Sequence, residues 1–95
     1  MEEWEYAFDP QKNVWLVRER GISFEQIIAL IASSKLIRVL EHPNAERHPN
    51  QLLYEVDVDG YMHVVPVVRE GRMLFLKTIY PSRKATRRRG KGKRA

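Results

Sequence analysis

Acidic and basic side chains in the second half of the chain are of the types that cleave a phosphodiester without a metal ion. Such cleavage needs a base for the attacking hydroxyl, an acid for the leaving oxygen and cations for the charge that builds on the phosphate. Glu55 is a candidate base, and Lys77 and Arg83 are candidate cations. Lys77 stands in an otherwise apolar run, and Arg83 follows the end of that run after Pro81 and Ser82. The alternatives are a Lys77–Glu55 ion pair and a solvated Arg83.

The C-terminal segment is strongly basic and predicts binding to nucleic acid. Residues 82–95 contain eight of the seventeen Lys and Arg residues and no Asp or Glu, so residues 1–81 hold nine bases against twelve acids, a net charge of −3. A basic segment binds polyanions by releasing their counterions. The candidate RNA contacts are Lys84, Arg87 and Arg88 in this segment and Arg47 and His48 in a polar loop. For the arginines, the alternative is nonspecific charge.

Composition excludes several other classes of site. The chain of 95 residues has no cysteine, which excludes a thiol nucleophile and a cysteine zinc site. His42 and His48, together with Glu41 and Glu46, match no standard zinc spacing, so we expect no metal and no cofactor. No apolar run reaches the roughly 18 residues that a membrane span needs. We therefore expect a cytoplasmic protein with one domain over residues 1–81 and a basic segment, 82–95, whose end is flexible.

Capping signals define two helices after a short strand. Alternation of Trp4, Tyr6 and Phe8 predicts an edge strand with an aromatic face. Asp9-Pro10 is a helix start and Gly21 a helix end, which predicts a helix over residues 10–20. The stretch 23–26, Ser-Phe-Glu-Gln, matches a capping box and starts a second helix that ends near residues 33–34.

The rest of the chain is expected to be a meander of strands. Residues 36–40 are rich in β-formers, 42–50 form a polar loop, and strands are predicted over 51–58, 61–69 and 72–80. The predicted class is α+β in the order β-α-α-β-β-β-β, followed by the basic tail. Pro66 cannot donate a ladder hydrogen bond, so we expect a bulge or a one-sided break there.

Two-residue turns would fix the register and the two faces of the sheet. Val58 would then oppose Tyr61, and Arg69 would oppose Arg72. This register puts Glu55, Val64 and Lys77 in one cross-strand row on the face away from the helices. Tyr54, Tyr80 and His63 fall on the helix face. Packing in the core is therefore expected of them rather than proton donation or base stacking.

Three segments together resemble the BrnT-type toxins of bacterial type II toxin-antitoxin systems. They are residues 8–12, Phe-Asp-Pro-Gln-Lys; residues 21–25, Gly-Ile-Ser-Phe-Glu; and residues 82–87, Ser-Arg-Lys-Ala-Thr-Arg. Glu19 and Arg20 stand where family members usually carry a Lys-His pair. The resemblance implies a RelE-like fold that seats RNA on the sheet face free of helices. It also implies a metal-independent endoribonuclease that acts on RNA, including mRNA on ribosomes, to inhibit translation, and a cognate antitoxin protein as partner.

Two other functions fit the same sequence. A noncatalytic nucleic-acid binder would need only the basic segment, with Lys77 and Glu55 as ordinary sheet residues. By analogy of fold, a toxin that acts on DNA gyrase is a further alternative.

Overall fold

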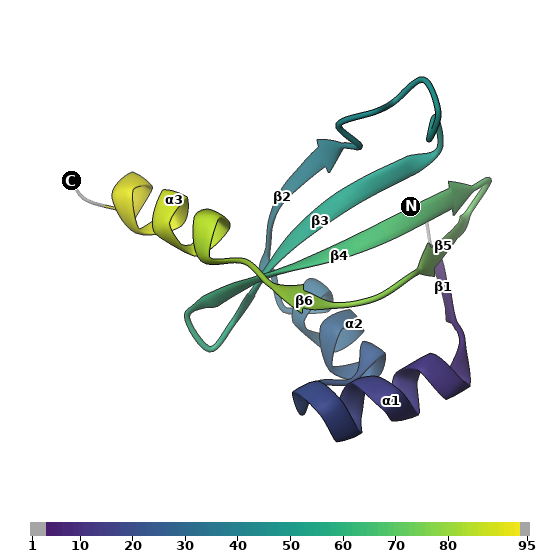
Figure 1. The fold of residues 1–95 in the computed structure, drawn as a ribbon, viewed down its shortest axis with the longest axis horizontal. Coiled ribbons are helices and arrows are strands. Elements are labelled where there is room, and N and C mark those ends of the chain that lie inside the picture. The colour runs from purple at the N-terminus through teal and green to yellow at the C-terminus, as the bar shows by residue number, and fades with distance from the viewer. Residues whose placement is uncertain (1–3, 94–95) are drawn as a thin grey trace.

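The structure is a computed structural model that describes residues 4–93, which form an α+β fold of three helices and a six-stranded mixed sheet (Figure 1). The elements are β1 (Glu5–Phe8), α1 (Pro10–Arg20), α2 (Phe24–Ala32), β2 (Leu36–Glu41), β3 (Gln51–Val58), β4 (Tyr61–Glu70), β5 (Met73–Leu76), β6 (Tyr80–Pro81) and α3 (Arg83–Lys93). The α1 and α2 helices lie together on one side of the sheet. The α3 helix lies at the end of the sheet, away from α1.

Both N-terminal helices begin and end where the capping signals predict. The Asp9 carboxylate accepts a hydrogen bond from the Gln11 N–H, and Gly21 closes α1 in the left-handed conformation at φ 69°. The Ser23 hydroxyl accepts from the Gln26 N–H at the start of α2. Unpaired amides in the first turn explain both caps, because side-chain oxygens satisfy them.

Asn13 joins α1 to the start of α2. Its Oδ1 accepts from the Phe24 N–H at 2.7 Å, and its Nδ2 donates to the Glu25 carboxylate at 2.7 Å. This hydrogen bond, before any other cause, lowers the pKa of Glu25 below its ordinary value of 4.5. One amide side chain therefore joins α1 to the first turn of α2 by two hydrogen bonds.

Strand order along the sheet is β1-β5-β4-β3-β2, with β6 pairing separately with β4. The edge strand β1 runs parallel to β5, and the other pairs are antiparallel. The β3–β4 hairpin has the predicted register, with Val58 opposite Tyr61, and Asp59 and Gly60 both have positive φ, as a type I′ turn requires. The first strand is thus confirmed at an edge.

The second hairpin corrects the predicted register by two residues. Arg69 pairs with Leu74, not with Arg72, because Gly71 and Arg72 form the turn. A shift of two preserves which side chains share a face, since the side-chain period of a strand is two. Leu74 and Leu76 therefore still face the helices.

The single strand predicted over residues 72–80 is wrong, because it breaks opposite Pro66. The Lys77 N–H donates to the Pro66 carbonyl at 2.8 Å, so the proline nitrogen that cannot donate also faces this side. Pairing resumes one residue out of step, with Val64 opposite Tyr80. The expected one-sided break at Pro66 is confirmed, and its consequence is that the last residues of the strand exchange faces.

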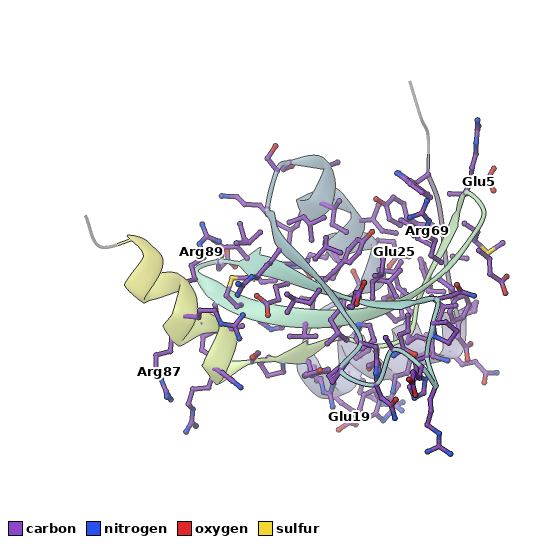
Figure 2. All side chains as sticks on the ribbon, turned by 90° about the horizontal axis from the view of Figure 1, so that it is seen from above. Glu5, Glu19, Glu25, Arg69, Arg87 and Arg89 are labelled. Atoms are coloured by element: carbon purple, nitrogen blue, oxygen red, sulfur yellow. The ribbon has the colours of Figure 1, made fainter. Side chains whose placement is uncertain are left out.

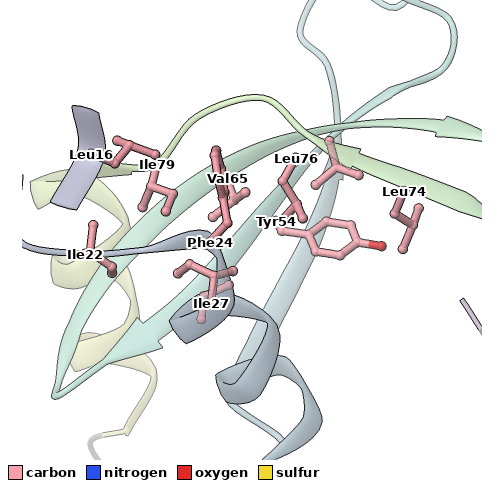
Figure 3. Close-up of a cluster of buried hydrophobic side chains, with 11 residues drawn as sticks. Leu16, Ile22, Phe24, Ile27, Tyr54, Val65, Leu74, Leu76 and Ile79 are labelled. Atoms are coloured by element: carbon pink, nitrogen blue, oxygen red, sulfur yellow. The ribbon is translucent and has the colours of Figure 1, made fainter. Parts of the chain in front are cut away.

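The core lies between the sheet and the pair α1 and α2 (Figure 3). Phe24 and Ile27 from α2 and Leu16 from α1 are completely buried against Val65 from β4. Ile79, expected on the opposite face, is also completely buried in this core. The exchange of faces after Leu76 explains its position.

The basic C-terminal segment is a helix and not the tail that the fold prediction ended with. Residues 83–93 form α3, which packs on β4. The expected flexible end, residues 94 and 95, lies outside the described residues. The two-helix prediction therefore missed one helix, which has two glycines and no acidic residue in its first turn and so carries little helix signal.

Loss of the α2 cap tests this account of the helix start. Ser23→Ala removes the acceptor of the Gln26 N–H and should lower the free energy of unfolding by about 1 kcal/mol in urea denaturation. Ser33→Ala is the matched control, since Ser33 closes the same helix with its backbone N–H. Equal effects of the two substitutions would contradict the assignment.

Protonation of Glu25 should weaken the junction of α1 and α2. The folded pKa of Glu25 is lowered, so its contribution is present above the unfolded pKa and is lost as the pH falls through the folded value. The parent should therefore be more stable than Glu25→Gln at pH 7, and the difference should shrink in urea denaturation at pH 3. A difference that stays constant over this interval would refute the linkage.

Candidate nucleic-acid interface

The start of α3 is built from three residues of the 82–87 motif. The Ser82 hydroxyl caps the helix by accepting from the Ala85 N–H at 3.0 Å, and Ala85 is buried. The Thr86 hydroxyl accepts from the Met62 N–H at 2.8 Å, and the Ser82 N–H donates to the Met62 carbonyl. Ser82, Ala85 and Thr86 thus attach α3 to the outer edge of β4.

Two ion pairs hold the middle of α3 against β3. Arg88 lies 3.2 Å from the Glu55 carboxylate, and Arg89 lies 2.8 Å from Asp57. Glu55 is a buried charged residue whose side chain is 7% exposed, whereas the Arg88 side chain is 40% exposed. Arg88 therefore binds a buried carboxylate from a position that is itself partly in solvent.

The register brings four side chains into one row across four strands. Arg38 of β2 pairs with Glu55, Glu55 with Val64 of β4, and Val64 with Tyr80 of β6. Paired residues of antiparallel strands share a face, so this row lies on the face opposite the core. Strands are about 4.8 Å apart, which puts the backbones of Glu55 and Tyr80 about 10 Å from each other across Val64.

A hollow of about 290 Å³ opens over one half of this row. It is lined by Ile37, Arg38, Glu55, Met62, Ala85, Arg88 and Arg89. Three arginines and one buried glutamate thus line the same hollow, and Arg88 is in direct contact with the glutamate. Arginine binds phosphate oxygens through paired N–H donors, so the hollow has the chemistry of a phosphate site with a base beside it.

Lys77 does not join this row, which corrects the predicted Glu55-Val64-Lys77 arrangement. It lies opposite Pro66 in the connection between β5 and β6, and its side chain is exposed. Tyr80 takes the predicted place of Lys77 beside Val64. The turn at Gly71-Arg72 is the physical reason, because it moves Lys77 two residues along β4 to the place opposite Pro66, and the break after Lys77 then adds the one-residue shift that brings Tyr80 beside Val64.

Three further cations of the first two turns of α3 face solvent. Arg83, Lys84 and Arg87 are exposed, and Figure 2 shows Arg87 on the outer side of the helix. Arg89, by contrast, reaches back to the sheet, where it also contacts the Met62 sulfur at 3.7 Å. The helix therefore has a solvent face of cations and a sheet face of ion pairs.

Arg47 and His48 are exposed in the loop between β2 and β3 and do not line the hollow. The His48 ring lies 4.1 Å from that of His42, whose Nδ1 accepts from the Asn44 N–H. A second hollow of about 360 Å³ at this end is lined by Pro49, Asn50, Leu52, Arg69 and Gly71. Its lining has one charged residue and no carboxylate, so, unlike the hollow at Glu55, it contains no candidate base.

The predictions for Tyr54, Tyr80 and His63 have different outcomes. Tyr54 lies in the core as expected, and burial raises the pKa of its phenol. Tyr80 was expected in the core but is 37% exposed on the other face. His63, expected to be buried, is partly exposed and lies edge-on to Tyr61. Of the three, Tyr80 is therefore the side chain available to a ligand on the Glu55 face.

Sequence reasoning missed Arg38 and Tyr80 in the row. No motif contains Arg38, and its position follows only from the pairing of β2 with β3, which includes a bulge after Leu36. For Tyr80 a signal existed, since a proline on a central strand implies a register change on one side. The direction of the shift, however, depends on how the chain continues into α3.

Residues 4–93 contain no group of three or more His, Asp or Glu side chains placed to hold a metal ion, and none of the described helices is long and apolar enough to span a membrane. Comparisons of the chain with protein-family profiles, curated proteins and solved structures find no match.

Thr86→Val tests the attachment of α3 to β4. The substitution keeps the shape of the side chain but leaves the buried Met62 N–H without its acceptor, at a cost of about 1–3 kcal/mol in the free energy of unfolding. Thr78→Val, in the connection between β5 and β6, is the control and should change stability by less than about 0.5 kcal/mol. An unchanged unfolding midpoint for Thr86→Val would show that α3 is attached by other contacts.

Proposed function

We propose that this chain is a RelE-like toxin of the BrnT type, a cytoplasmic, metal-independent endoribonuclease that a cognate antitoxin protein neutralises. The observation that carries the proposal is the hollow that Arg38, Arg88 and Arg89 line together with the buried Glu55. The resemblance of residues 8–12, 21–25 and 82–87 to those toxins supplies the class of substrate. The exposed cations of α3 support it, because they add attraction for a polyanion.

The reaction assigned to this hollow is attack of a ribose 2′-hydroxyl on the adjacent phosphorus. Glu55 takes the proton of the 2′-hydroxyl as the new O–P bond forms, and the bond from phosphorus to the 5′-oxygen breaks. The products are a 2′,3′-cyclic phosphate and a 5′-hydroxyl. Arg38 and Arg88 stabilise the charge that develops on the phosphate oxygens, since both line the hollow at Glu55.

Tyr80 is the proposed acid. Its phenol lies in the same cross-strand row as Glu55, and a spacing of about 10 Å between the two backbones leaves room for a phosphodiester between the side chains. The phenol donates its proton to the leaving 5′-oxygen. Arg83, Lys84 and Arg87 bind the phosphates of flanking nucleotides along the exposed side of α3.

Binding of RNA without cleavage is the second candidate, and one observation favours it. The Arg88 guanidinium donates to both oxygens of the Glu55 carboxylate, so these oxygens are already engaged and do not face a ribose hydroxyl freely. In that case Glu55 only positions α3.

Cleavage of a labelled single-stranded RNA by purified variants separates the two candidates. Glu55→Gln should reduce the rate by about 10²-fold or more, and Arg38→Ala and Tyr80→Phe by about 10²-fold each, because each removes one group that acts in the transition state. RNA affinity should not fall in Glu55→Gln, so that a lower rate reports the chemical step and not binding. Growth arrest on expression in bacteria should follow the same order.

Substitution of two further cations tests where the scissile phosphate binds. Arg83→Ala should weaken RNA binding, and Lys77→Ala should lower cleavage by less than about tenfold, since Lys77 stands outside the row. Arg18→Ala, an exposed cation of α1, is the control for charge alone. RNA binding with no cleavage by the parent would favour the second candidate, and a larger loss for Lys77→Ala than for Arg38→Ala would move the phosphate away from the hollow.

A further inference from the structure

The composition of α3 makes it a weak helix. Its eleven residues include two glycines, Gly90 and Gly92, and no acidic residue. Cations also recur at the i, i+4 spacing, at which like charges repel; examples are Arg83 with Arg87 and Lys84 with Arg88. Arg83 and Lys84 in the first turn oppose the helix dipole as well. The helix therefore depends on contacts with the sheet.

Those contacts lie on one side of the helix and consist of a short apolar contact, the Thr86–Met62 hydrogen bond and two ion pairs. Ala85 is the buried residue of α3 among those described, and its methyl group covers little area. Arg88–Glu55 and Arg89–Asp57 are the ion pairs, with Arg88 40% and Arg89 25% exposed. Two carboxylates of β3 thus hold in place a helix whose own cations repel one another.

The same two arginines line the hollow at Glu55. A phosphate or sulfate group in the hollow competes with Glu55 and Asp57 for them, because the N–H groups that the ligand engages are no longer available to the two carboxylates. Binding of a polyanion and attachment of α3 are therefore opposed, and each must weaken the other by the same factor.

We propose that α3 is an autoinhibitory strap whose Arg88–Glu55 and Arg89–Asp57 contacts are broken when a polyanion binds. In the unbound chain Arg88 neutralises Glu55. When Arg88 moves to the phosphate, Glu55 is left as a free carboxylate beside the attacking hydroxyl. This regulation rests on the proposed ribonuclease function, but the movement of α3 can be measured without any reaction.

The Met62 N–H reports whether α3 is attached. Its acceptor is the Thr86 hydroxyl on α3, so release of the helix exposes this amide to solvent. Amide hydrogen exchange, followed by NMR with and without a saturating heparin hexasaccharide, should show exchange at Met62 accelerated by about tenfold or more. Heparin is a polyanion without a ribose phosphate to cleave. Val65, opposite Tyr54 in the β3–β4 ladder, is the internal reference and should not change.

A charge-neutral variant provides the second arm. Glu55→Gln combined with Asp57→Asn should accelerate exchange at Met62 by about tenfold without heparin, whereas the control Glu70→Gln should not. Protection of Met62 that persists at saturating heparin would overturn the proposal, as would failure of heparin to bind or equal exchange in the two variants. Release of α3 by heparin without cleavage of RNA would support the autoinhibitory strap and contradict the ribonuclease function. Cleavage of RNA with the Met62 amide still protected would contradict the autoinhibitory strap and support the ribonuclease function.

Discussion

The missing N–H of Pro66 is the constraint on which the functional half of the structure depends. The carbonyl of this residue accepts from Lys77, so its nitrogen faces the same neighbour and cannot return a hydrogen bond. The β3–β4 ladder on the other side of β4 runs without a break. The last strand must therefore leave β4 and rejoin it out of register. A proline in the middle of a sheet is tolerated because only one of its two edges is affected.

The one-residue shift has two structural consequences. Ile79 turns into the core and becomes completely buried beside the N-terminal helices, where the Arg20 guanidinium also donates to its carbonyl. Tyr80 turns to the opposite face, beside Val64. A single register change thus fills the core and places a phenol in the row of Glu55. Arg20 thereby fastens α1 to the connection that makes the shift.

The chain then enters α3, which covers the end of the same sheet face. Ser82, Ala85 and Thr86 attach it to Met62 with little apolar area, and charge supplies the remainder. Because Glu55 is buried and its partner is half in solvent, the ion pair is an unequal one: loss of Arg88 leaves a buried charge, whereas loss of Glu55 leaves a solvated guanidinium. Because of this asymmetry, the Glu55 carboxylate depends on the ion pair more than the Arg88 guanidinium does.

Local chemistry determined the parts of this protein that the sequence predicts well. Caps at Asp9, Gly21 and Ser23 and the turn at Asp59-Gly60 involve neighbours in sequence, so the residue types alone set the ends of α1 and α2 and the β3–β4 register. Glu55 and Arg88 were recognisable as charged candidates, but not as a pair. The tertiary structure alone decided that pair, the position of Tyr80, the place of Arg38 and the existence of α3. The reason is physical: each depends on strands and a helix that are distant in sequence, and a shift of one residue in their pairing exchanges the two faces of the sheet.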